Sequence, residues 1–143
     1  MKTLSETASA KFESGCNCSQ AVLSAACDRL SLDCEQAMKM AGGFGGGRHE
    51  VCGALAGGIL ALSIRHARTA KPASPGDGAL YAQVKDLVDR FQKRHGGIRC
   101  KELLGGCDLQ TETGKADFKQ RGLKQVTCAC CVASVASSLE EVL

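Results

Sequence analysis

Apolar residues recur at helical spacing along most of the chain. In the first half, the pattern predicts four helices, over residues 4–14, 17–30, 33–41 and about 49–68. Asn17, a residue type that caps helices, opens the second helix, and the Gly42-Gly43 pair ends the third. The first half of the chain is therefore expected to be helical.

The second half continues the helical pattern. Residues 79–94 place five apolar side chains on one face, those of Leu80, Val84, Leu87, Val88 and Phe91. Short helical elements are expected near 98–105 and 113–123, and a final helix over residues 127–143. The start of that last segment is also rich in strand formers, but no other segment could pair with it. We therefore expect an all-α, compact single-domain bundle of about five to seven helices, spanning residues 1–143.

Two segments indicate which parts of the chain lie at the surface and which are buried. Residues 71–78, "KPASPGDG", hold both prolines and two glycines, so a mobile surface loop is expected there. The longest apolar run, "VCGALAGGILALSI", covers 14 residues, whereas a bilayer span needs about 20. That run predicts a buried core helix, and we expect no membrane-spanning segment.

The composition and charge bear on how the core is built and on which partners are expected. With no Trp, one Tyr and four Phe, the core must consist mainly of small aliphatic side chains, which implies closely spaced helices. The net charge of +3 is modest, and its basic residues are dispersed, which favours a solvated surface over a nucleic-acid interface. We expect no nucleic-acid partner.

Ten cysteines are the exceptional feature of the composition. The start, "MKTLSETASAKF", has no apolar signal region, so we expect a cytoplasmic protein. Thiols stay reduced there, and dense cysteine then indicates metal binding or redox activity rather than structural disulfides. Cys27 is interpreted as a small buried apolar residue and Cys34 as an exposed thiol near a helix start.

Four of the cysteines fall at expected helix N-termini: Cys18, Cys52, Cys100 and Cys128. Unpaired N–H groups and the helix dipole favour a thiolate at such a position. Thiolate is the form that binds metals and attacks disulfides. If the four ends converge, their N–H groups can also donate to bound sulfur.

Glycines surround Cys52. Gly53, Gly57 and Gly58 each cost a helix about 1 kcal/mol relative to alanine, so close approach of a cofactor or of another helix should compensate. Both explanations stay open. The loop "GGFGGG" lacks the Lys-Ser/Thr and the preceding strand of a phosphate loop, so a nucleotide site is not expected.

Four motifs in register, "GCNCSQAV", "EVCGALAGG", "CKELLGGCDL" and a terminal cysteine before "SSLEEVL", resemble one protein family. It is the bacterial and archaeal C_GCAxxG_C_C family of redox-active proteins, which has a CGAxxG motif and four invariant cysteines. The resemblance runs from about Phe12 to Leu143. The invariant cysteines correspond to Cys18, Cys52, Cys100 and Cys128.

The resemblance implies redox chemistry, and similarity to related domains fused to haem modules implies an iron–sulfur cluster. On this hypothesis the four cysteines are the metal ligands, Gly53 and Gly57 make room for the cofactor, and the chain is a small electron carrier or redox sensor. The chain departs from the family pattern at Cys16, His49, Cys130 and Cys131 and by an extra glycine before Cys107. It stays open which of the four cysteines Cys16, Cys107, Cys130 and Cys131 join the site.

Two alternatives remain. The first is a thiol–disulfide oxidoreductase that uses Cys128 with Cys131, a C-x-x-C pair, or with Cys52. The second is a structural zinc or metal-binding module on the same ligands. His49 and Glu50 could form a proton relay or a ligand, or simply the polar first turn of a helix. The redox partner protein is unknown, and whether two copies pair is left open.

Overall fold

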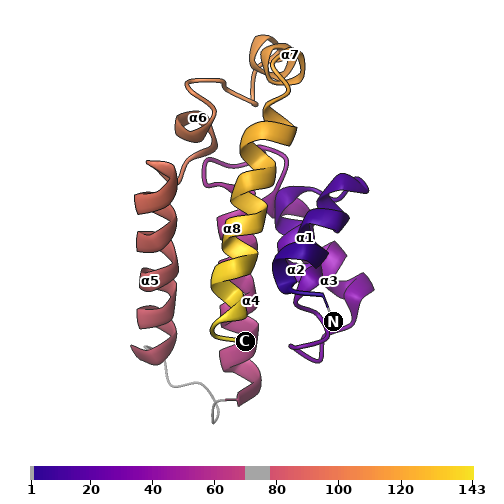
Figure 1. Ribbon diagram of the computed structural model, residues 1–143, viewed down its shortest axis with the longest axis vertical. Coiled ribbons are helices and arrows are strands. Elements are labelled where there is room, and N and C mark those ends of the chain that lie inside the picture. Colours follow the sequence, from indigo (N-terminus) through magenta and orange to yellow (C-terminus); the bar gives the residue numbers. More distant parts are fainter. Residues whose placement is uncertain (1, 70–77) are drawn as a thin grey trace.

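The computed structural model describes residues 2–69 and 78–143, and helices dominate this part of the chain (Figure 1). Its eight α-helices are α1 (Leu4–Glu13), α2 (Cys18–Ala25), α3 (Cys34–Ala41), α4 (Gly53–Thr69), α5 (Gly78–His95), α6 (Cys100–Leu103), α7 (Glu112–Gln120) and α8 (Ala129–Glu140). A 3₁₀ turn, η1 (Gly42–Phe44), follows α3, and a π-helical turn, η2 (Lys124–Cys128), precedes α8. The described residues contain no strand, so the all-α prediction is confirmed.

The helix count exceeds the expected five to seven because the two short elements after α5 each form a helix of their own, α6 and α7. The predicted mobile loop at residues 71–78 lies outside the described residues except for Gly78, which is the first residue of α5.

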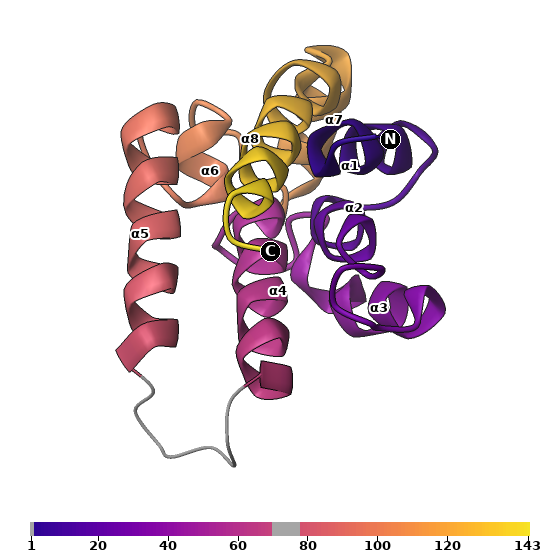
Figure 2. The same ribbon diagram turned by 60° about the horizontal axis from the view of Figure 1, so that its bottom comes forward.

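Helices α4 and α8 form the centre of the bundle (Figure 2). Helix α8 packs against α1 and α4, and α2 packs against α4 on the same side. Leu55 and Leu62 of α4 and Val132, Val135 and Leu139 of α8 are fully buried. Helix α5 completes the core from the other side through residues of its predicted apolar face, of which Leu87 and Phe91 are the most buried.

Polar caps determine where the N-terminal helices begin. The Asn17 side chain accepts a hydrogen bond from the backbone N–H of Gln20, and the Gln20 side chain accepts one from the N–H of Asn17. This reciprocal pair satisfies two N–H groups that a helix start leaves unpaired. Asp33 caps α3 by accepting from the N–H groups of Glu35 and Gln36. The predicted start of the second helix at Asn17 is confirmed.

Helix α4 begins at Gly53, four residues later than predicted. Gly46 and Gly47 adopt left-handed φ angles of 69° and 73°, which turn the chain before the helix. Cys52 was expected in the first turn of this helix, but it lies immediately before that turn. Its carbonyl accepts a hydrogen bond from the N–H of Ala56. Cys52 therefore occupies the capping position of α4.

Two glycines of α4 allow close helix packing. A Cβ on Gly57 would lie 2.8 Å from the carbonyl oxygen of Ser19 in α2. A Cβ on Gly58 would lie 2.7 Å from Val135 of α8. The contacts of Gly57 therefore support the packing explanation of this glycine.

Within residues 2–69 and 78–143, no single helix is long and apolar enough to cross a membrane. One pair of consecutive helical segments in this part of the chain meets the criterion by length and composition alone, Glu112–Gln120 with Lys124–Glu140. The two segments are bent by 73° relative to each other.

Candidate functional site

A cavity of about 410 Å³ lies where α2, α6, η2 and the start of α4 meet, and it collects most of the cysteines. The four predicted ligands, Cys18, Cys52, Cys100 and Cys128, all line it, although 110 residues separate the first from the last. Two further cysteines, Cys16 and Cys131, line it as well. The fold thus brings six thiols from distant segments to one cavity.

A short backbone pairing holds Cys52 beside Cys100. Val51 and Arg99 form an isolated antiparallel bridge. The N–H of Cys52 donates to the carbonyl of Ile98 at 2.7 Å, and the N–H of Cys100 donates to the carbonyl of Glu50 at 2.8 Å. Because these bonds involve only backbone, the two sulfurs are positioned independently of their own side-chain chemistry.

The N-terminus of α4 directs its free N–H groups at two of these sulfurs. The N–H groups of Leu55 and Ala54 bond the sulfur of Cys52, and that of Gly53 bonds the sulfur of Cys100. Such donors stabilise a thiolate. The sequence predicted N–H donors of this kind at helix starts. In the structure the N-terminus of α4 supplies such donors to both Cys52 and Cys100.

Of the two glycines predicted to make room for a cofactor, only Gly53 lines the cavity. A Cβ at this position would lie 2.9 Å from the Cα of Gly45 and 3.2 Å from the Cβ of Cys18. Gly57 is not among the lining residues and faces α2 instead.

Cys128 does not occupy a free helix N-terminus, contrary to expectation. It is the last residue of the π-helical turn, which runs without a break into α8. The wide turn begins after Gly122, whose φ of 63° ends the preceding segment. Interruptions of this kind are frequent at functional sites, because they redirect a side chain without ending the helix.

Two thiol pairs determine the ionisation of the cavity. The Cys18 thiol hydrogen-bonds to the Cys128 sulfur, which raises the pKa of Cys18 and lowers that of Cys128. The Cys131 thiol bonds the sulfur of Cys52 in the same way, which raises the pKa of Cys131 and lowers that of Cys52 to about 7. In each pair the hydrogen bond therefore makes one sulfur more acidic and the other less acidic than an ordinary thiol.

Cys100 differs from these pairs. Burial raises its pKa to about 11, and the neighbouring sulfurs of Cys52 and Cys128 add to the effect. The expected thiolate character is therefore found at Cys52 and Cys128 and reversed at Cys18 and Cys100. At Cys18 the hydrogen bond to Cys128, followed by burial and repulsion from the other sulfurs, outweighs the helix N-terminus, and at Cys100 burial and that repulsion do so. All four therefore become thiolates only when a cation offsets their charge.

Positive side chains complete the wall of the cavity. Arg48, Lys115 and Lys124 line it, and the described residues that line it include no carboxylate. The Arg48 guanidinium donates to the carbonyl of Gly45 at 2.9 Å, and the Lys124 ammonium lies 5.2 Å from the centre of the Phe12 ring. This basic lining was not predicted from the sequence, since no motif links Lys115 of α7 to the cysteines and the dispersed basic residues indicated only a solvated surface.

The structure separates the cysteines that the sequence left open. Cys16 and Cys131 line the cavity, whereas Cys107 and Cys130 do not. The Cys107 thiol is buried and donates to the carbonyl of Gly114 at 2.9 Å, and Cys130 is exposed on α8. Only Cys16 and Cys131 are therefore placed to join the other four.

His49 and Glu50 lie outside the cavity. The His49 ring nitrogen Nε2 lies 2.7 Å from the carbonyl oxygen of Phe44. Glu50 is exposed and lies 3.9 Å from the Arg99 guanidinium. Neither residue is in the first turn of α4, which begins later than predicted.

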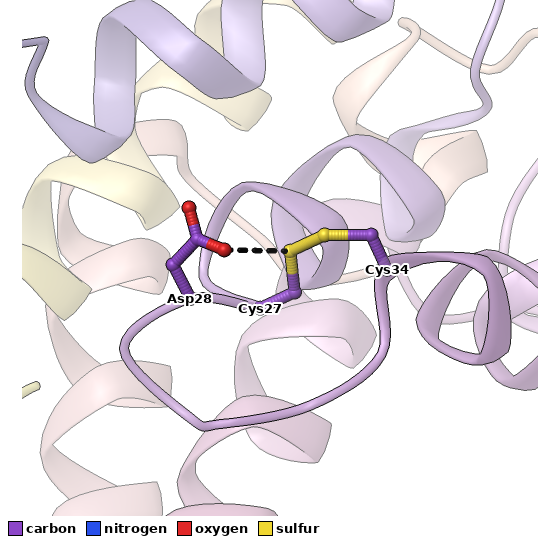
Figure 3. A group of neighbouring side chains, drawn as sticks. All are labelled: Cys27, Asp28 and Cys34. Atoms are coloured by element: carbon purple, nitrogen blue, oxygen red, sulfur yellow. Dashed lines mark hydrogen bonds between the residues drawn. A yellow bond between two sulfur atoms is a disulfide. The ribbon is translucent and has the colours of Figure 1, made fainter.

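Cys27 and Cys34 form a disulfide, which corrects their interpretation as a buried apolar residue and a free thiol (Figure 3). Cys27 is indeed buried and Cys34 exposed, but the turn after α2 brings their Cα atoms within 5.5 Å. With Asp28 they form the one group of three metal-type donors within 4.8 Å of one another in the described part of the chain. Both sulfurs are bonded to each other, so neither offers a thiolate to a metal here.

The fold and the cavity define a class, that of cysteine-rich, all-α proteins whose thiols gather at one site. The family described as "Putative redox-active protein (C_GCAxxG_C_C)" matches residues 16–142, and the chain belongs to this family. No curated protein matches the chain. No solved structure matches it either.

Proposed function

We propose that the protein is a small electron carrier or redox sensor that binds an iron–sulfur cluster through Cys18, Cys52, Cys100 and Cys128. The observation that carries the proposal is the gathering of these four cysteines, from four separate segments, around one cavity of about 410 Å³. Four thiolates are the usual ligand set of such clusters, and when bound the cluster would supply reversible one-electron transfer.

The spacing of the sulfurs favours a cluster over a single zinc ion. Sulfurs bound to one tetrahedral zinc lie about 3.8 Å apart, given Zn–S bonds of about 2.3 Å. Among the described residues, no three of the cavity sulfurs lie within 4.8 Å of one another. A multinuclear group spreads its ligands more widely, which suits this arrangement better.

The chain's own groups would hold and tune such a cofactor. The N–H groups of Gly53, Ala54 and Leu55 donate to cysteine sulfurs, and hydrogen bonds to ligand sulfurs are one determinant of reduction potential. Arg48, Lys115 and Lys124 would offset the negative charge of four thiolates and their cofactor.

The test is anaerobic purification, followed by analysis of iron and acid-labile sulfide together with an absorption spectrum. A brown protein with both elements and a reversible redox couple supports the proposal. Protein that stays colourless and binds neither element after anaerobic reconstitution with iron and sulfide contradicts it.

A second candidate is thiol–disulfide exchange inside the cavity. It is supported by the contact of Cys131 with Cys52, whose pKa of about 7 makes it a thiolate near neutral pH. The pair that this contact favours is Cys52 with Cys131, rather than Cys128 with Cys131 or Cys52. A disulfide between Cys52 and Cys131 that forms reversibly in metal-free protein, with no metal bound after reconstitution, would favour this candidate.

A further inference from the structure

A second thiol pair lies outside the cavity, on the loop that joins α2 to α3. Cys27 follows α2, Cys34 is the first residue of α3, and seven positions separate them. Figure 3 shows the disulfide between them with the Asp28 carboxylate beside it. None of these three residues lines the cavity, so the pair forms a site of its own.

The two sulfurs differ in access. Cys34 is exposed, whereas Cys27 is only 3% exposed. Disulfides are reduced by attack of a thiolate on one sulfur, and access decides which one is attacked. An incoming thiolate therefore reaches the sulfur of Cys34, and Cys27 is the leaving group.

Asp28 lies beside that leaving group and can accept a hydrogen bond from it once the Cys27 sulfur is protonated. Its Oδ1 atom lies 4.0 Å from the sulfur of Cys27, along the dashed line in Figure 3. A disulfide sulfur carries no proton, so a hydrogen bond along this line forms only when Cys27 is reduced and its S–H can donate. The neighbouring base, Arg29, pairs with Glu140 and so leaves the Asp28 carboxylate available.

The surface around Cys34 is acidic. Asp28, Asp33 and Glu35 are exposed within eight residues of one another. The Asp33 carboxylate accepts two backbone N–H groups of α3, and Glu35 lies 3.3 Å from Lys39. Since Asp28 and Asp33 have no basic side chain paired with them among the described residues, an anionic thiol is repelled here and a cationic one attracted.

We propose that Cys27 and Cys34 form a second redox centre, an exchange site that cationic thiols, or a partner thiol on a basic surface, reduce by attack on Cys34. The thiolate forms a bond to the Cys34 sulfur as the S–S bond breaks, and Cys27 leaves as a thiolate that takes a proton from water. A second thiol then displaces Cys34, which also takes a proton. The disulfide gains two electrons and two protons, and two thiol molecules are oxidised to one disulfide.

The first experiment maps mixed disulfides in the full-length chain. Protein with the substitution Cys27→Ser is incubated with cystamine, the disulfide of cysteamine, and its peptides are then analysed by mass spectrometry. The expected adduct is cysteamine on Cys34. In the matched variant Cys34→Ser, the buried Cys27 should gain at least tenfold less adduct. Equal labelling of Cys27 and Cys34 in the two variants would overturn the assignment.

The second experiment tests the charge preference on wild-type protein. Cysteamine and glutathione, a cationic and an anionic thiol, are compared at equal thiolate concentration by counting the loss of the Cys27–Cys34 disulfide. Cysteamine should react several-fold faster at low salt, and the difference should narrow at high salt. Equal rates at low salt would refute the preference for cationic thiols.

Neither readout depends on the cavity. Iron and sulfide contents are expected to be unchanged in both variants, because neither cysteine lies at the cavity wall. A protein that binds no cluster but forms the adduct on Cys34 would contradict the proposed function alone. A protein that binds the cluster but whose native disulfide resists an excess of dithiothreitol would contradict the exchange site alone.

Discussion

Gly53 faces Cys18 at the cavity wall so closely that a Cβ added to Gly53 would lie 3.2 Å from the Cβ of Cys18. The same Cβ would lie 2.9 Å from both the Cα of Gly45 and the carbonyl oxygen of Phe44. The helix that carries the CGAxxG motif is thus packed against the segment before it through a residue with no side chain.

We predict that Gly53→Ala lowers the free energy of unfolding by about 1–3 kcal/mol, since backbone atoms must shift to admit the methyl group. The measurement is urea unfolding followed by circular dichroism. The control is Gly78→Ala at the start of α5, where nothing lies within 4 Å of the added Cβ. Equal effects of the two substitutions would show that Gly53 is not tightly packed.

Substituting a proposed ligand is expected to lower the iron content of the protein, whereas substituting a cysteine outside the cavity is not. Cys18→Ser should lose most of the iron, because it removes one thiolate from the cavity. Cys130→Ser should keep wild-type iron, since Cys130 is exposed and does not line the cavity. Iron analysis of both variants after anaerobic reconstitution is the measurement, and equal iron in the two would count against the ligand set.

Cys131 is expected to control the ionisation of Cys52 in metal-free protein. Loss of its S–H in Cys131→Ala should raise the pKa of Cys52 from about 7 toward the ordinary thiol value. The thiolate fraction at pH 7 then falls roughly tenfold. The pH profile of iodoacetamide labelling at Cys52 measures the change, and Cys131→Ser, which keeps a donor, should shift it less. An unchanged profile in Cys131→Ala would contradict the contact.

His95 should make the protein less stable in acid. Burial lowers the pKa of His95, and Arg94 adds to the effect, while its Nε2 lies 2.7 Å from the hydroxyl of Ser134. The folded chain therefore binds fewer protons than the unfolded chain below pH of about 6.5, so stability falls as the pH drops through this range. Urea unfolding at pH 7.5 and 5.5 should show a smaller acid-induced loss in His95→Gln than in wild type. An equal loss in both proteins would rule out this role.

Ser31 carries the one positive φ among non-glycine residues of the described chain, at 51°. A side chain disfavours this conformation, so Ser31→Gly should raise the free energy of unfolding by about 1 kcal/mol. Ser31→Ala, which keeps the Cβ, should give no such gain. Thermal unfolding of the three proteins, with the disulfide intact, makes the comparison.

The positions of the helices could be predicted well where a local signal exists. Asn17 starts α2 as expected, because a cap depends only on residues three positions away. The predicted start of α4, near residue 49, is four residues too early, because the apolar run extends through Cys52 and hides the turn that Gly46 and Gly47 impose. For that reason Cys52, predicted to lie inside the helix, is the capping residue before it.

The candidate site was less accessible to sequence reasoning. The neighbourhood of Cys52 and Cys100 depends on the bridge between Val51 and Arg99, a long-range pairing with no repeat or spacing to reveal it. The disulfide between Cys27 and Cys34 depends on the turn after α2, and seven residues is not a recognised cysteine spacing. A pattern reports which residues share a face, but not which turns bring separate segments together.

The π-helical turn from Lys124 to Cys128 has a consequence for how such a site can arise. One extra residue in a helix rotates everything before it by about 100° relative to everything after it. Val132, Val135 and Leu139 can therefore keep their places in the core while Cys128 turns toward the cavity. A single-residue insertion during evolution would be enough to recruit a cysteine to the site from a helix whose packing face was already established.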